Sequence, residues 1–128
     1  MPREIIATDK APKAIGPYSQ AVAFEKLIFT AGQIALDPHT GELAATDIEG
    51  QVYKVLDNLK AVLEAAGSNM QRILKLTVFL LDLNDFAKLN AVFNEYFPTN
   101  PPARSAVQVS RLPRDVRVEI EAIAVREN

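Results

Sequence analysis

The segment from Ile73 to Leu81 constrains the fold more than any other part of the chain. It reads ILKLTVFLL, so branched and aromatic residues fill most positions and apolar side chains fall on both faces. This pattern is typical of a central strand in a sheet that is covered on both sides. A fold that contains this segment must therefore provide cover for two apolar faces.

Two amphipathic segments can supply part of that cover. The first follows Thr46 and Glu49, which fit a capping box, and its apolar residues recur at helical spacing as far as Gly67. The second runs from about Asn84 to Phe97, where prolines prevent its continuation. The second helix has an apolar stripe made of Phe86, Leu89, Phe93 and Phe97.

Shorter apolar runs on either side of these helices predict further strands. Residues 20–35 fit a hairpin, and residues 103–109 and 116–125 fit two more strands. The resulting order indicates an α+β fold in a single domain that spans residues 1–128. Two helices cover only one face of such a sheet, so we expect self-association to cover the other apolar face.

Composition limits the chemistry that such a domain can carry. The 128 residues include fourteen basic and sixteen acidic side chains, and the formal charge of −2 gives no attraction to nucleic acid or anionic lipid. The chain has no cysteine and one histidine, which excludes thiol nucleophiles and leaves a zinc site without its usual ligands. We therefore expect no metal in the chemistry of this chain. The sequence shows no apolar signal or membrane segment, so we expect a cytoplasmic protein.

Arg104 and Glu119 are the first candidates for chemistry. Arg104 follows two prolines at the start of a predicted strand, where its fork of donors can clamp a carboxylate, although a surface ion pair gives the same pattern. Glu119 lies inside the last predicted strand, where it can orient a water as a general base or face solvent beside Glu121. The local sequence leaves both alternatives open.

Other candidates lie where a cleft can form. Asn90 falls on the apolar stripe of the second helix and either bonds backbone or reaches a ligand. Tyr18 follows a glycine-proline turn and is either a core residue or a cleft wall with a polar tip. Gly32 follows a strand, where glycine permits close approach or marks a bulge. His39 lies in a turn and is expected to be exposed rather than catalytic.

Five longer motifs follow one another along nearly the whole chain. They are IGPYSQA at 15–21, FTAGQIALDPHTGEL at 29–43, LDNLKAVLEAAG at 56–67, DLNDFAKLNAVFNEYF at 82–97 and PPARSAVQVSRLPRDVRVEIEAIA at 101–124. Together they strongly resemble the reactive intermediate deaminases, the Rid family. The resemblance implies a chorismate-mutase-like subunit, with a mixed sheet of about six strands and both helices on one face. It also implies a homotrimer with active clefts between subunits.

The resemblance assigns roles by motif position. Arg104 is similar to the carboxylate-binding arginine of the family, and Glu119 to the acid that holds the hydrolytic water. Tyr18, Gly32 and Asn90 match positions that line the cleft. The implied reaction is hydrolysis of 2-iminopropanoate and 2-iminobutanoate, which pyridoxal-phosphate-dependent dehydratases release as enamines, to 2-oxo acids and ammonia. No cofactor is required.

Two substrate-binding positions depart from the commonest bacterial pattern. Ala31 stands where many relatives have serine, and Ala106 where many have cysteine. The first change removes a hydroxyl that can contact substrate, and the second excludes thiol-dependent regulation at that place. Neither removes the arginine or the acid, so the expected reaction is kept while the preferred imine side chain is left open.

Two other functions fit parts of the sequence. Removal of Met1 would give Pro2 a free amine, which trimeric tautomerases use as a base, although Arg3 and Glu4 do not extend an apolar strand from it. A non-catalytic protein that binds small carboxylates, or one directed at RNA as some relatives have been described, fits the same arginine. The near-neutral charge and the lack of a basic, aromatic surface argue against RNA.

Overall fold

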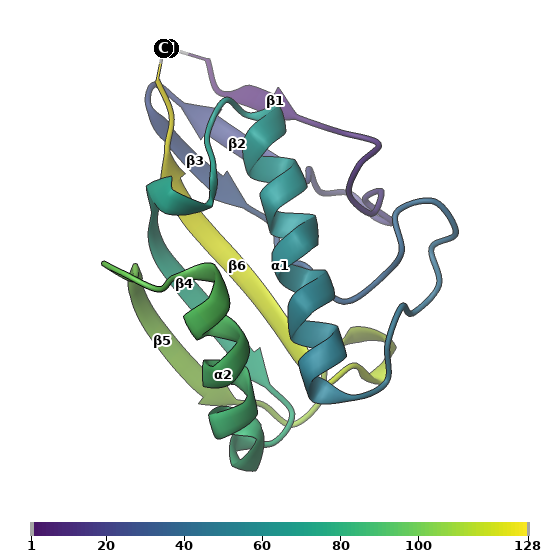
Figure 1. Cartoon of the computed structure of the whole chain (residues 1–128). Helices are drawn as coiled ribbons and strands as arrows, with labels where there is room; N and C mark the ends of the chain where they lie inside the picture. Colours follow the sequence, from purple (N-terminus) through teal and green to yellow (C-terminus); the bar gives the residue numbers. More distant parts are fainter. Residues whose placement is uncertain (1, 128) are drawn as a thin grey trace.

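The computed structural model describes residues 2–127, which form one mixed sheet with two main helices (Figure 1). The strands are β1 (Glu4–Ile6), β2 (Ala21–Phe24), β3 (Leu27–Thr30), β4 (Ile73–Leu80), β5 (Ala103–Gln108) and β6 (Val118–Val125). The helices are α1 (Ile48–Ala65) and α2 (Phe86–Tyr96), and short 3-10 turns occupy Met70–Arg72, Leu83–Asp85 and Pro113–Asp115. The predicted α+β class is confirmed.

The strands follow one another in the order β1-β2-β3-β6-β4-β5. Every pairing is antiparallel except that of β4 with β5, whose parallel arrangement needs the crossover through α2. The last strand in the chain, β6, therefore lies in the middle of the sheet, between β3 and β4 (Figure 1).

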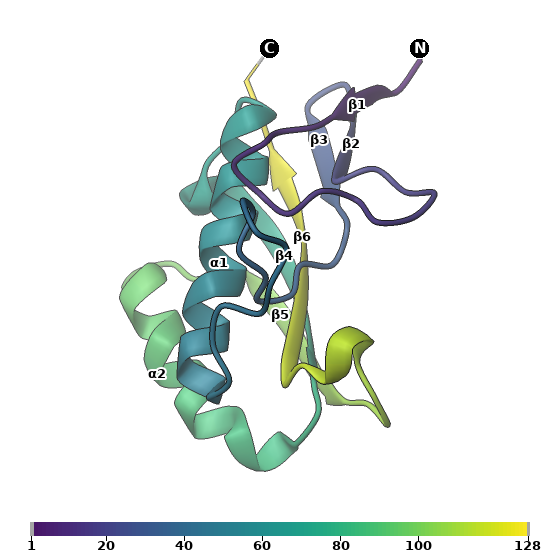
Figure 2. The ribbon, with the colours of Figure 1, turned by 90° about the vertical axis from the view of Figure 1, so that its right-hand side faces the viewer.

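Both helices pack on the same face of the sheet (Figure 2), as predicted. Alternate residues of the central strands point towards the helices, because successive side chains of a strand face opposite sides. The core between the layers includes Leu76, Val78, Leu80, Val118, Ile120, Val52, Val55, Leu56, Leu59, Val62 and Leu63. In the part of the chain that the structure describes, no helix combines the length and hydrophobicity needed to cross a bilayer.

The opposite face of the sheet carries exposed apolar side chains. Phe29 on β3 is 45% exposed and pairs with the half-buried Ile123 on β6, while Val107 on β5 is 46% exposed. On β4, a bulge between Ile73 and Lys75 interrupts the simple alternation of side chains. As a result Ile73 is buried in the core, whereas Leu74 is 49% exposed.

The ends of α1 show one error in the sequence interpretation and one confirmed prediction. Asp47, rather than Thr46, is the N-cap residue, and its side chain accepts a hydrogen bond of 3.0 Å from the backbone N–H of Gly50. The predicted capping box is therefore wrong, because the residue three positions after Asp47 is Gly50, which has no side chain to complete it. Gly67 follows the last turn with a φ of 85°, the left-handed conformation that commonly ends helices.

Candidate functional site

Glu119 lies in the wall of a pocket on the open side of the sheet. Its neighbours Val118 and Ile120 are buried in the core, so the alternation of β6 turns Glu119 to the opposite face, where it is half-buried. The pocket has a volume of about 360 Å³. Its lining brings together four predicted site residues, Tyr18, Ala31, Gly32 and Glu119, with Pro12, Lys13, Ile15, Gln33, Ile34, Leu36, Pro113 and Arg114.

Gly32 makes room for the Glu119 side chain. A Cβ atom at Gly32 would overlap Oε2 of Glu119 and lie 2.8 Å from its Cδ. The backbone is held there by the next residue, because Gln33 and Ile120 exchange hydrogen bonds of 2.8 and 3.1 Å between their backbone groups. Close approach, rather than a bulge, is therefore the reason for a glycine at this place.

The Glu119 carboxylate accepts no hydrogen bond from any group within residues 2–127, and its oxygens reach solvent. Burial raises the pKa of this carboxyl group, and the charge of Glu121 on the same face of β6 adds to the effect. A carboxylate with raised pKa and free lone pairs can accept a hydrogen bond from water and act as a general base.

Arg104 has a different environment. It lies opposite the buried Leu76 in the parallel pairing of β4 and β5, so its side chain lies on the helix side of the sheet. Its Nη1 donates a hydrogen bond of 2.7 Å to Oδ1 of Asn90. Its guanidinium carbon lies 5.0 Å from the ring centre of Phe86 and 5.3 Å from that of Phe93. Burial lowers the pKa of Arg104, although a guanidinium stays charged at physiological pH.

The three partners of Arg104 come from one face of α2. Phe86, Asn90 and Phe93 stand four and three residues apart, the spacing that aligns side chains along a helix. The arginine lies beside a hollow of about 380 Å³. Its other lining residues are Leu76, Asn94, Phe97, Pro101 and Pro102. The sequence is compatible with either a backbone bond or a ligand contact for Asn90, and in the structure its side chain accepts a hydrogen bond from Arg104 instead.

A single chain does not bring Arg104 and Glu119 into one pocket. On β4, Arg104 is opposite Leu76 and Glu119 is opposite Phe79, and residues an odd number apart on a strand face opposite sides. Ala106 shares the helix side with Arg104 and packs against the core. The two predicted catalytic residues therefore belong to two separate half-sites of the same subunit.

Some neighbours of the half-sites were not singled out from the sequence. Phe86 and Phe93 were recognised only as an apolar stripe, and their spacing around Asn90 was the available signal. Lys13 and Arg114 line the Glu119 pocket, and no sequence pattern indicates this. Among residues 2–127, no three His, Asp or Glu side chains gather to hold a metal ion.

His39 is exposed, as predicted. The backbone N–H groups of His39 and Thr40 donate to Oδ1 of Asp37 at 2.8 and 3.1 Å. These bonds lower the pKa of the Asp37 carboxyl group and order the turn. The histidine lines neither half-site.

Comparison with known proteins gives consistent matches over nearly the full length. The family described as Endoribonuclease L-PSP matches residues 8–126. A RutC family protein of Pyrococcus abyssi is 56% identical over 99% of this chain and 100% of its own. The 2-iminobutanoate/2-iminopropanoate deaminase of Escherichia coli is 53% identical over 94% of this chain and 96% of its own. The crystal structure of Escherichia coli TdcF with bound serine has a TM-score of 0.91 at 50% identity, covering 97% of this chain and 99% of its own.

Proposed function

The chain belongs to the Rid family, also described as the endoribonuclease L-PSP family, and on this premise we propose that it is a 2-imino acid deaminase. Its proposed substrates are 2-iminobutanoate and 2-iminopropanoate, the compounds named for the Escherichia coli relative. The observation that carries the proposal is the pair of half-sites. One presents an arginine with free donors, and the other presents a carboxylate with free lone pairs.

The two groups suffice for the proposed chemistry. The carbon of a protonated imine is already electrophilic, so the enzyme has chiefly to hold the substrate and present water. Arg104 anchors the substrate carboxylate. Glu119 orients a water molecule and takes one of its protons as the water oxygen bonds to the imine carbon. That proton then moves to the amine nitrogen of the tetrahedral adduct. The C–N bond breaks while the hydroxyl group of the adduct gives its proton to Glu119 and becomes the carbonyl, so ammonia and the 2-oxo acid are released.

We propose that the working site joins half-sites from two copies of the chain. Arg104 of one subunit and Glu119 of its neighbour would then face the same substrate. The placement of the two residues on opposite faces of one sheet supports this arrangement, as does the exposed apolar face around Phe29. We expect a homotrimer, and light scattering that gave a monomer mass at micromolar concentration would contradict it.

The lining of the Glu119 pocket supports a preference for imines with short aliphatic side chains. Ile15, Ile34 and Leu36 supply apolar walls, and Ala31 offers a methyl group in place of a hydroxyl. Apolar lining with few polar groups is the usual composition of small-molecule sites. No cofactor enters the proposed reaction, because water is the nucleophile and the substrate supplies the electrophile.

A coupled assay tests the proposal directly. A threonine dehydratase generates the imine, and ultraviolet absorbance follows its decay with and without this protein. We expect faster decay with the protein present and a rate close to the uncatalysed one with the Arg104→Ala variant. Unchanged decay, together with binding of 2-oxobutanoate, would identify a non-catalytic carboxylate-binding protein. A variant with an N-terminal extension that kept full activity would exclude Pro2 as the base.

A further inference from the structure

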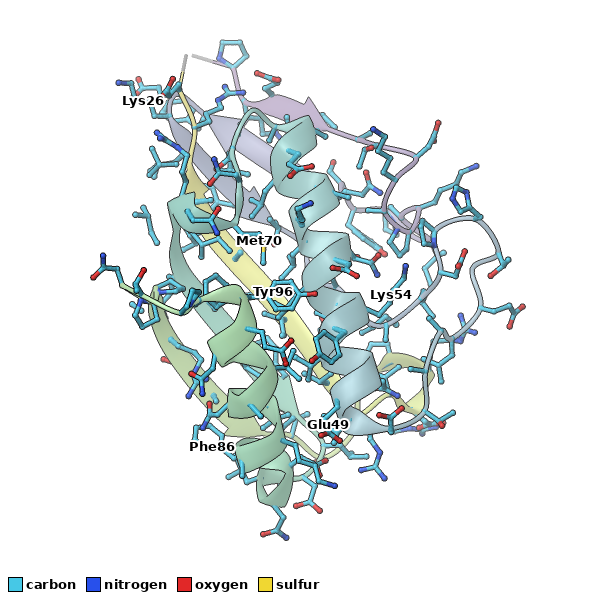
Figure 3. The ribbon with its side chains drawn as sticks, in the orientation of Figure 1. Lys26, Glu49, Lys54, Met70, Phe86 and Tyr96 are labelled. Carbon is cyan, nitrogen blue, oxygen red and sulfur yellow. The ribbon has the colours of Figure 1, made fainter. Side chains whose placement is uncertain are left out.

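We infer that Phe86 and Phe93 are positioning residues, which fix the direction of the Arg104 guanidinium and thereby set the affinity for the substrate carboxylate. The inference rests on the proposed role of Arg104 as the carboxylate anchor. It assigns to one face of α2 a task that the apolar stripe alone does not indicate. Figure 3 labels Phe86 on this helix, next to β5.

The first argument is the geometry around the guanidinium. Its carbon atom lies 5.0 Å from the ring centre of Phe86 and 5.3 Å from that of Phe93, within the range of about 6 Å for attraction between a cation and an aromatic face. Asn90, on the turn between the two rings, accepts the hydrogen bond from Nη1 at 2.7 Å. Three contacts from one rigid helix therefore act on one planar group.

The second argument is that the core does not need the ring of Phe86. Leu89 is fully buried and Val92 is 2% exposed, whereas Phe86 is 37% exposed. Phe93 both packs in the core and contacts Arg104. It is 7% exposed, and its ring centre lies 5.7 Å from that of Phe97. An aromatic side chain that is left partly in solvent beside a guanidinium is better explained by that contact than by packing.

The third argument concerns the donors that remain. Asn90 occupies Nη1, while Nε and Nη2 of Arg104 have no hydrogen-bond partner within the described residues. These two nitrogens can bind a carboxylate side-on with two parallel hydrogen bonds. A guanidinium that is already fixed loses less conformational freedom on binding, so preorganisation by the rings increases affinity.

The test compares two variants of Phe86. In Phe86→Leu the side chain stays apolar but loses its aromatic face, and we expect the Kd for 2-oxobutanoate and the KM for the imine to rise roughly 3- to 10-fold. The value of kcat should stay within about twofold, because an anchor contributes equally to ground state and transition state. Phe86→Tyr keeps the ring and should restore wild-type values.

Tyr53 provides a matched control on the other helix. It is also 37% exposed, but its ring lies 6.2 Å from that of Tyr96, which Figure 3 labels, and among residues 2–127 no arginine lies over it. Tyr53→Leu should leave Kd and KM unchanged. Calorimetry gives Kd without turnover, and the Tm of each variant shows whether folding is intact.

Several outcomes would overturn the inference. These are unchanged Kd and KM in Phe86→Leu, or a weakening of equal size in Phe86→Tyr or Tyr53→Leu. A wild-type protein that binds 2-oxobutanoate but hydrolyses no imine removes the deaminase proposal and leaves this test in place. A wild-type protein that does not bind 2-oxobutanoate overturns both, because Arg104 is then no carboxylate anchor.

Discussion

Arg104 and Glu119 are held in opposite ways. The guanidinium contacts two aromatic rings and a side-chain amide of α2, whereas the carboxylate has no hydrogen-bond partner within residues 2–127 and lies against the backbone of Gly32. Burial nevertheless acts on both groups, since it lowers the pKa of the arginine and raises that of the glutamate. The comparison indicates a preorganised anchor in one half-site and an accessible base in the other.

The difference arises from what lies over each strand. Arg104 is on the edge strand β5, and α2 packs over its side of the sheet, so helix side chains at regular spacing reach it. Glu119 is on the central strand β6, but it faces the side without helices, where loop residues form the wall. A helix can therefore supply fixed contacts to the anchor, and the loops leave room for water beside the acid.

The largest expected effect comes from removing the anchor. Arg104→Ala should lower both kcat/KM and the affinity for 2-oxobutanoate by roughly 10²-fold or more, because a charge-assisted bidentate contact is lost. Arg104→Lys should rescue little, since a point charge cannot reproduce the planar fork. Kinetics and calorimetry on the same preparations check this. An Arg104→Lys variant close to wild type would show that charge alone, rather than held geometry, matters in this half-site.

The second effect concerns the base alone. Glu119→Gln keeps the shape of the side chain but removes its negative charge, so kcat should fall by about 10²-fold while 2-oxobutanoate binding stays largely intact. Kinetics gives kcat and calorimetry gives the Kd for 2-oxobutanoate, so the two effects can be measured separately. If binding were lost as completely as in Arg104→Ala while the assembly remained intact, Glu119 would have a structural role, for example as the partner of the arginine across subunits.

The third effect displaces Glu119 without altering it. Gly32→Ala adds a methyl group where Oε2 of Glu119 lies, so the carboxylate must move, and we expect kcat to fall roughly tenfold or more. Affinity for 2-oxobutanoate should not change. Gly16→Ala is the control, because its added methyl meets only the ring of Tyr18, at an ordinary 3.7 Å. Equal effects of both substitutions would remove the steric explanation.

The fourth and smallest effect is on pH dependence and stability. Because the pKa of Glu119 is raised, kcat should fall on acidification at a higher pH than for a fully solvated glutamate. In Glu119→Gln this acidic decrease in the pH–rate profile should be absent. The pKa of Glu119 is higher in the folded state than in the unfolded state, so ionisation of this group costs the folded state more free energy. The fold is therefore destabilised in full above the folded-state pKa, and there is no effect on stability below the unfolded-state pKa.

Glu119→Gln should therefore raise the Tm slightly at neutral pH and leave it unchanged in acid. Solvent screens the half-buried carboxylate, so the gain should stay below about 1 kcal/mol. Thermal unfolding of the wild type and of Glu119→Gln at several pH values measures this difference in Tm. A lower Tm for the glutamine variant at neutral pH would mean that an interaction in the assembled protein stabilises the charged form.

Periodicity in the sequence was sufficient for the helices, the hairpin and the strands from β4 onwards. It could not show on which face Arg104 lies, because that depends on the register of β5 against β4 across the α2 crossover. The bulge beside Leu74 illustrates the same limit, since one extra residue reverses the side to which a strand residue points. The three-residue strand β1 is too short to produce a periodic signal.

The position of β6 has a consequence for the synthesis of the protein. A nascent chain that has not yet reached Val118 can form the β2-β3 hairpin and the β4-α2-β5 unit, but no strand pairing joins them into one sheet, because their shared neighbour in the sheet is the strand still to come. Sheet closure therefore depends on contacts that are distant in the sequence, which slows folding. Until β6 inserts, the edges of β3 and β4 are open, and open strand edges can pair with strands of other chains.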